Sequence, residues 1–106
     1  MTIKLFDKTV ELKFSFKAEM LFEQINDKTF TAQTTTEWVE YLFCCIIAQL
    51  GDGSVKYDEF LTWLDENPDV IFDFMQWYTD TMTEINRMRS KKEEEKVAVT
   101  GKKGKK

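Results

Sequence analysis

The stretch TTTEWVEYLFCCIIAQLG, residues 34–51, decides the fold. Its three threonines offer side-chain oxygens that can cap the first turn of a helix, and Gly51 is a typical residue directly after a last turn. Between these two signals, apolar side chains cover nearly the whole circumference of a helix over residues 36–50. Because a helix that is apolar all round has to be covered all round, we predict that this segment lies at the centre of the domain.

The segment before this central helix predicts a β-hairpin followed by a short helix. Apolar and polar residues alternate over residues 2–16, with a turn at residues 7–9, and this pattern is typical of two strands. A two-stranded ribbon is marginally stable by itself, so we expect Phe14 and Phe16 to pack against helices. Residues 17–26 then predict a helix. Its expected inward side carries Met20, Leu21 and Ile25.

Two further helices are predicted after the central one. Residues 57–66 form the first, and Asn67-Pro68 marks the start of the second, because proline is tolerated at the first position of a helix. The final helix is expected over residues 68–95. Residues 97–106 are rich in lysine and glycine, and we predict that this basic tail is disordered. The remainder, residues 1–96, is expected to be a single domain of the α+β class that is mostly helical.

The composition of the chain narrows its possible chemistry. Its 106 residues include no histidine, which excludes catalytic histidines and histidine metal ligands. Residues 1–90 carry 8 basic and 16 acidic side chains, net −8, whereas residues 91–106 carry 7 basic and 3 acidic, net +4. An acidic body repels a phosphate backbone, so we expect no nucleic-acid binding. Since no acid is paired with a nucleophile at a recognisable spacing, we predict a protein that is not an enzyme and uses no cofactor.

The two cysteines, Cys44 and Cys45, are neighbours within the apolar run of the central helix. Adjacent cysteines close no stabilising loop and lack the C-x-x-C spacing of redox and metal sites, so we expect buried, reduced thiols. No apolar stretch reaches the ~18 residues of a membrane span, and the N-terminal residues contain no signal-peptide core. We therefore expect a cytosolic protein that does not bind membranes.

The loop after the central helix is similar to the second half of an EF-hand calcium loop. With Glu59 as the twelfth ligand, Gly53 falls on the sixth position, as such a loop requires. The first and third positions, which need oxygen ligands, fall on Ala48 and Leu50, so the obvious carboxylates are Asp52 and Glu59. We predict no metal site here, and a degenerate EF-hand-like regulatory or binding module is the alternative reading of the chain.

The final helix has more apolar residues than one face can hold, because seven of the nine residues 70–78 are apolar. Apolar residues at alternating spacings of four and three form one face, which can pack on the central helix. The other apolar residues of the segment lie outside this face and have no predicted contact within the domain. Aromatic residues and methionine are favoured anchors of protein interfaces. We therefore predict a partner-binding patch, with a helix sandwiched inside the core as the alternative. The candidate contact residues are Val70, Phe74, Trp77, Tyr78 and Met82.

Two stretches carry a resemblance to a known family. The sequence LKFSFKAEMLFE at residues 12–23, followed by Lys28-Thr29-Phe30, and YDEFLTWLD at residues 57–65 resemble the tail assembly chaperones of long-tailed bacteriophages and prophages, specifically their short upstream product. The resemblance covers roughly residues 3–90. It implies a non-enzymatic protein of the host bacterial cytoplasm that binds and solubilises the tape measure protein. It also implies that the chain helps to recruit the tail tube protein and forms a homo-oligomer.

Overall fold

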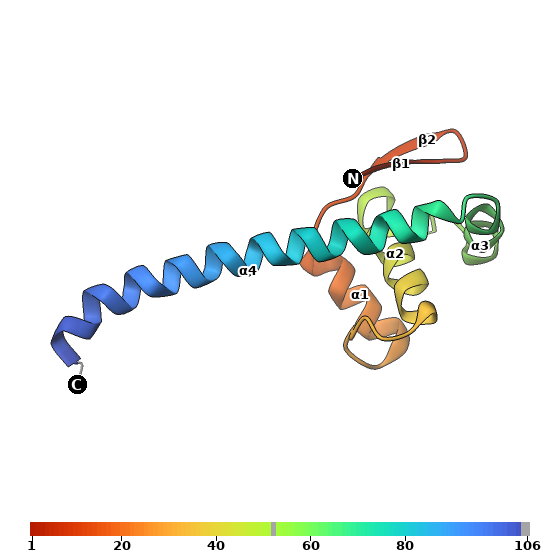
Figure 1. Cartoon of the computed structure of the whole chain (residues 1–106). Coiled ribbons are helices and arrows are strands. Elements are labelled where there is room, and N and C mark those ends of the chain that lie inside the picture. The colour runs from red at the N-terminus through yellow and green to blue at the C-terminus, as the bar shows by residue number, and fades with distance from the viewer. Residues whose placement is uncertain (52, 105–106) are drawn as a thin grey trace.

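The computed structural model describes the backbone of residues 1–51 and 53–104, and the side chains of these ranges up to residue 90. Within these residues, a two-stranded hairpin is followed by four helices, which confirms the predicted α+β class with mostly helical content (Figure 1). The elements are β1 (Thr2–Leu5), β2 (Lys8–Glu11), α1 (Phe16–Asn26), α2 (Thr35–Leu50), α3 (Tyr57–Glu66) and α4 (Asp69–Gly104).

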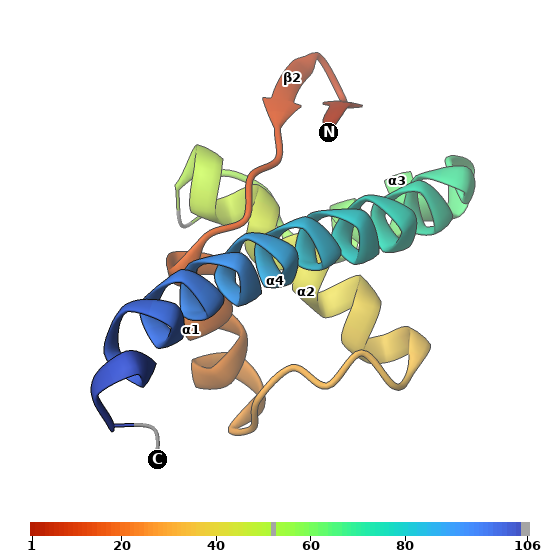
Figure 2. The same ribbon diagram turned by 60° about the vertical axis from the view of Figure 1, so that its left-hand side comes forward.

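The arrangement of these elements separates a globular body from a projecting helix. α4 crosses the body next to α2 and then continues well beyond it, and the hairpin and α1 lie on opposite sides of α4 (Figures 1 and 2). The molecule is consequently elongated, measuring 58 Å along its longest axis and 26 and 24 Å across. One end of α4 therefore belongs to the core, and the other end does not.

The hairpin is shorter than predicted. β1 and β2 pair antiparallel, with Leu5 opposite Lys8, so the connection is the two-residue turn Phe6–Asp7 rather than residues 7–9. A two-residue loop requires unusual backbone angles, and Phe6 accordingly has a φ of 57°. β2 ends at Glu11, so the segment from there to residue 16 is not strand. The buried side chains of the hairpin are Ile3, Leu5 and Val10.

The buried side of the first helix agrees with the prediction only at Leu21, which is half-buried against the core. Ser15 caps α1 by accepting a hydrogen bond from the Ala18 N–H at 3.3 Å, so Phe16 starts a helix instead of ending a strand and is 74% exposed. The buried residues of α1 are Ala18 and Phe22, because the Phe22 ring packs edge-on against Tyr41 of α2. Met20 and Ile25, expected to point inward, are exposed instead.

The central position predicted for α2 is confirmed. The Thr34 hydroxyl caps its start by accepting from the Glu37 N–H at 3.1 Å, and Gly51 follows its last turn with a φ of 103°. Eight of its 16 residues are buried, on several sides of the helix. Cys44 and Cys45 are free and buried, as expected, and burial raises the pKa of each thiol to about 12.

The last two helices begin close to where the sequence places them. α3 has the predicted bounds, and α4 starts at Asp69, directly after Pro68. α4 continues to Gly104, past the predicted end near residue 95. The disorder of the basic tail over residues 97–106 stays a prediction. No proline follows Pro68, and many of the later residues are good helix formers. Residues 105–106 lie outside the described residues.

Candidate protein-binding surface

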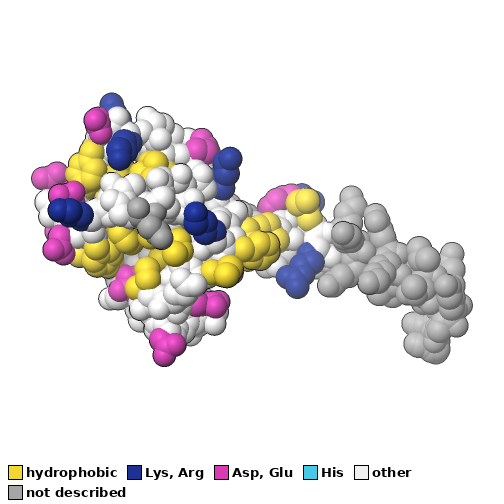
Figure 3. Space-filling view, turned by 180° about the vertical axis from the view of Figure 1, so that it is seen from behind, with side chains coloured by type: hydrophobic (Ala, Val, Ile, Leu, Met, Phe, Trp, Pro, Cys, Tyr) yellow, Lys and Arg dark blue, Asp and Glu magenta, His cyan; other side chains and the backbone are white. Residues whose placement is uncertain are grey.

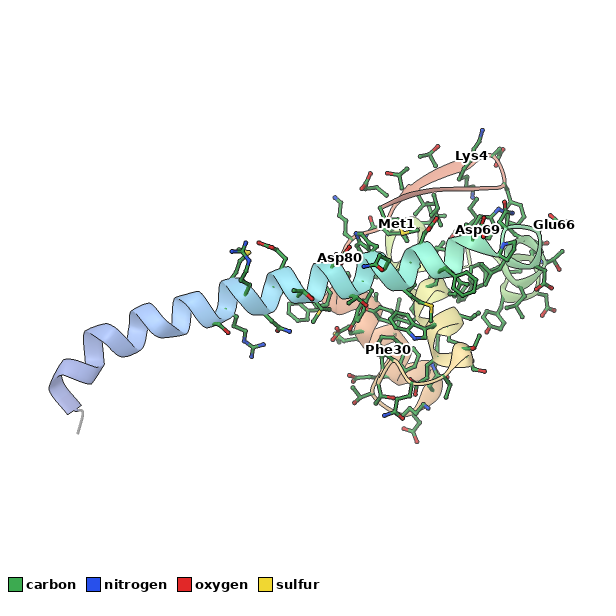
Figure 4. All side chains as sticks on the ribbon, in the orientation of Figure 1. Met1, Lys4, Phe30, Glu66, Asp69 and Asp80 are labelled. Atoms are coloured by element: carbon green, nitrogen blue, oxygen red, sulfur yellow. The ribbon has the colours of Figure 1, made fainter. Side chains whose placement is uncertain are left out.

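A cluster of aromatic rings packs the N-terminal part of α4 against the body. Its centre is Phe30, from the loop between α1 and α2 (Figure 4). The Phe30 ring stacks on Tyr41 with centroids 4.3 Å apart, and it meets Trp38 of α2 and Tyr78 of α4 edge-on at 5.2 and 5.5 Å. Edge-on and offset-stacked pairs at these distances add stability beyond the burial of the rings. Tyr78 is therefore held by rings from two segments, the loop that carries Phe30 and α2.

The loop that carries Phe30 is itself held by Glu37, a buried carboxylate in the first turn of α2. The N–H groups of Thr31 and Gln33 donate to its Oε1 at 3.3 and 3.0 Å, and Lys28 Nζ lies 2.7 Å from its Oε2. The hydrogen bond from Lys28, followed by the one from Gln33, lowers the pKa of Glu37 from 4.5 to about 2. Glu37 therefore stays ionised, and it positions the loop through several charge-assisted bonds.

Phe74, one of the predicted partner-binding residues, belongs to the core. Its side chain is 0% exposed, and its ring centroid lies 6.0 Å from that of Trp38 and 5.9 Å from that of Tyr41. This corrects the prediction that Phe74 is left over for a partner. The sandwiched arrangement is the right one at this position, because α2 packs against the face of α4 that contains Phe74.

The other four predicted contact residues, Val70, Trp77, Tyr78 and Met82, are half-buried. The Trp77 ring stacks on Phe74 at 5.7 Å, so part of its surface already has an internal contact. Tyr78 likewise makes internal contacts, because its ring packs within the aromatic cluster. These residues border the buried part of α4, and their role in binding a partner stays a prediction.

The apolar face of α4 continues beyond the body. Steps of three and four residues lead from Tyr78 to Met82, Ile85 and Met88, so these side chains share the face that is buried nearer the start of the helix. We call Met82, Ile85 and Met88 the distal stripe. Met88 is 61% exposed, and the other two are half-buried. In Figure 3, hydrophobic side chains extend from the body onto the described part of the projecting helix.

Sequence reasoning missed several exposed apolar residues. Phe72 on α4 is 65% exposed, and Phe16 and Met20 on α1 are 74% and 58% exposed. α1 begins beside the middle of α4, close to where α4 leaves the body (Figures 1 and 2). The continued spacing after Ile85 could have identified Met88 from the sequence. No comparable signal exists for α1, whose buried side is set by long-range ring contacts of Phe22 with Phe30 and Tyr41.

The loop after α2 does not have the geometry of a calcium loop. Residues at its first and third positions, Ala48 and Leu50, belong to the last turn of α2 and pack against the core. The Ser54 hydroxyl donates to the Gly51 carbonyl at 2.5 Å, which closes the turn internally. Glu59 lies exposed in the first turn of α3, whereas Asp52 is outside the described residues. Among the residues described, no group of three or more acidic or cysteine side chains gathers to hold a metal.

Two further observations bear on the surface. None of the helices, over the residues that the structure describes, is both long and apolar enough to cross a membrane. Comparisons with protein-family models, with curated proteins and with solved structures find no match to this chain. The candidate site therefore rests on the geometry of the distal stripe and the exposed side chains of α1.

Proposed function

We propose that this chain is a tail assembly chaperone of a long-tailed bacteriophage or prophage. In this proposal it acts in the cytoplasm of the host bacterium, where it binds the tape measure protein, keeps it soluble and helps to recruit the tail tube protein. It has no enzymatic role. The resemblance in residues 12–23, 28–30 and 57–65 supports the proposal from the sequence.

The distal stripe is the structural observation that carries the proposal. When the apolar face of a helix is not covered by the rest of its own domain, a second amphipathic helix can pack on that face. Other sides of this part of α4 carry polar pairs, with Gln76 donating to Asp80 at 2.9 Å and Arg87 pairing with Glu84. Such pairs, three or four residues apart, support the helix in water. A long helical protein is a suitable partner for such a surface.

The charge of the body supports the same function. Residues 1–90 carry a net charge of −8, and a net charge far from zero keeps a protein and its complexes dispersed. An acidic carrier with an apolar binding face can therefore hold an aggregation-prone helix without precipitating with it. This property matches the chaperone role and requires no catalytic group.

The proposal is tested by co-expressing the full chain with the tape measure protein of its own locus. We expect the chain to raise the soluble fraction of the tape measure protein and to co-purify with it. Ile85→Glu should weaken this binding about tenfold, because it places a charge in the middle of the apolar contact. The soluble fraction of the tape measure protein and the dissociation constant of the complex are the measurements.

Asn86→Glu is the matched control, since Asn86 is exposed on another side of the same turn of α4. It adds the same charge and should leave binding unchanged. The proposal fails if the wild-type chain leaves the tape measure protein insoluble. Equal effects of the two variants would instead remove the distal stripe from the binding surface.

A further inference from the structure

A second concave site lies away from the distal stripe, between the end of α1, the middle of α2 and the start of α3. Its volume is about 280 Å³. It is lined by Ile25, Glu40, Phe43, Cys44 and Tyr57. Small-molecule sites usually begin near ~300 Å³, so this pocket has the size for one protruding side chain.

The walls of the pocket are mainly apolar and aromatic. The rings of Phe43 and Tyr57 meet edge-on with centroids 5.0 Å apart, and Ile25 faces them from α1. Ile25 is 58% exposed and Tyr57 36% exposed. Two of the large hydrophobic residues that the body leaves in contact with water therefore border the same hollow, and an occupant would cover both.

Among the described residues that line the pocket, Glu40 is the one that carries a charge. No ion pair or side-chain hydrogen bond to its carboxylate occurs among the described residues. Burial and, after it, the negative charge of Glu40 raise the pKa of Cys44 to about 12 and also raise the pKa of Tyr57. The Glu40 carboxylate is thus close enough to influence the pKa of both Cys44 and Tyr57, which lie on different helices of the pocket wall. The pocket combines aromatic surface with a negative charge that has no counter-ion within the described part of the chain.

We propose that this pocket binds the guanidinium group of an arginine side chain presented by a partner protein. A guanidinium is planar and weakly hydrated, stacks on aromatic rings and forms paired hydrogen bonds with a carboxylate. A lysine ammonium is more strongly hydrated and matches an aromatic wall less well. The seven basic residues of segment 91–106 are all lysines, so this segment of a second copy matches the pocket less well than an arginine does.

The test uses the full chain and three small probes of equal chain length: n-butylguanidinium, n-butylammonium and n-butanol. Binding is followed by NMR at the resonances of Ile25, Cys44 and Tyr57. We expect n-butylguanidinium to bind in the millimolar range, at least about fivefold more tightly than n-butylammonium and about tenfold more tightly than n-butanol. Glu40→Gln should abolish the preference for the cation.

Glu66→Gln is the matched control, because Glu66 is an exposed carboxylate at the far end of α3. It removes the same charge and should leave the binding of all three probes unchanged. Phe43→Leu is a second variant that keeps an apolar wall but removes the ring, and it should weaken n-butylguanidinium binding more than n-butanol binding. Thermal melts confirm that each variant is folded before it is titrated.

The proposal is overturned if n-butanol binds as tightly as n-butylguanidinium, or if Glu40→Gln leaves the cation preference intact. Tighter binding of n-butylammonium, or binding of a peptide of residues 91–106 at the same resonances, overturns the assignment to an arginine of another protein. The pocket and the chaperone proposal are tested separately, because these probes contain no phage protein and Ile85→Glu lies outside the pocket.

Discussion

The near half of α4, which packs on the body, and the far half, which projects from it, have similar spacing of apolar residues but different surroundings. Near the start of the helix, Phe74 is 0% exposed and Tyr78 meets three aromatic rings, whereas Met88, on the same face further along, is 61% exposed. The spacing identifies which side of the helix is apolar. Whether that side is buried depends on how far the body reaches, and the body ends between Tyr78 and Met88.

The near half of α4 is also supported indirectly by the loop before α2. Glu37 fixes that loop through Lys28 and the N–H groups of Thr31 and Gln33, and the loop brings Phe30 against Tyr78. In the far half, the side-chain pairs seen as far as residue 90 are short-range pairs within α4, such as Arg87 with Glu84. Substitutions in the two halves of α4 should therefore differ in their effect on the free energy of unfolding.

The largest effect is expected for Phe74→Ala. This change removes a fully buried ring that packs on Trp38 and Tyr41, and such truncations lower the free energy of unfolding by about 3–5 kcal/mol. Phe72→Ala is the matched control, because Phe72 is on the same helix but 65% exposed. It should change stability by less than about 0.5 kcal/mol. Urea denaturation followed by circular dichroism measures both values, and equal losses would contradict the buried position of Phe74.

An intermediate effect is expected from acidification through Glu37. Its folded pKa of about 2 lies below the usual 4.5, so its contribution to stability is fully present above pH 4.5 and is lost as the pH falls from 4.5 toward 2. Urea midpoints measured across this range should decrease for the wild type. Glu37→Gln should lower the midpoint at pH 7 and flatten the decrease. Thr35→Ala, at an exposed residue of the same turn that makes no side-chain hydrogen bond in the described structure, is the control.

If Glu37→Gln loses stability with pH as steeply as the wild type, other carboxylates cause the acid sensitivity. In that case Glu37 would not be what holds Phe30 against Tyr78. The ring contacts can be followed directly, because loss of the loop should shift the aromatic resonances of Tyr78 before α2 itself unfolds.

The sequence was sufficient to predict the helices but not all of their orientations. Threonine caps, Gly51 and Pro68 mark the ends of α2 and the start of α4 to within about one residue, because these residues act through local backbone chemistry. The buried side of α1 could not be predicted in the same way. Met20 and Ile25 form an apolar face by spacing, and the long-range contact of Phe22 with Tyr41 turns that face outward.

The candidate site was predicted in part for the same reason. Spacing placed Val70, Trp77, Tyr78 and Met82 on or near an apolar face of α4, but it could not show that α2 covers Phe74. The pocket beside Glu40 had no sequence signal, since its lining comes from three helices. Its residues become neighbours only when α1 and α3 pack on α2.

The smallest effect is expected for Met88→Ala, which makes the matching truncation in the far half of α4. Because Met88 is mostly exposed and alanine favours helix, the free energy of unfolding of a dilute sample should change by less than about 0.5 kcal/mol. Self-association, which the family resemblance implies, would alter this result in a defined way. If a second copy covers the distal stripe, the wild-type melting temperature rises with protein concentration, and Met88→Ala reduces that rise. A large loss in dilute monomer would instead mean that the body reaches Met88, and the contrast between the two halves would be wrong.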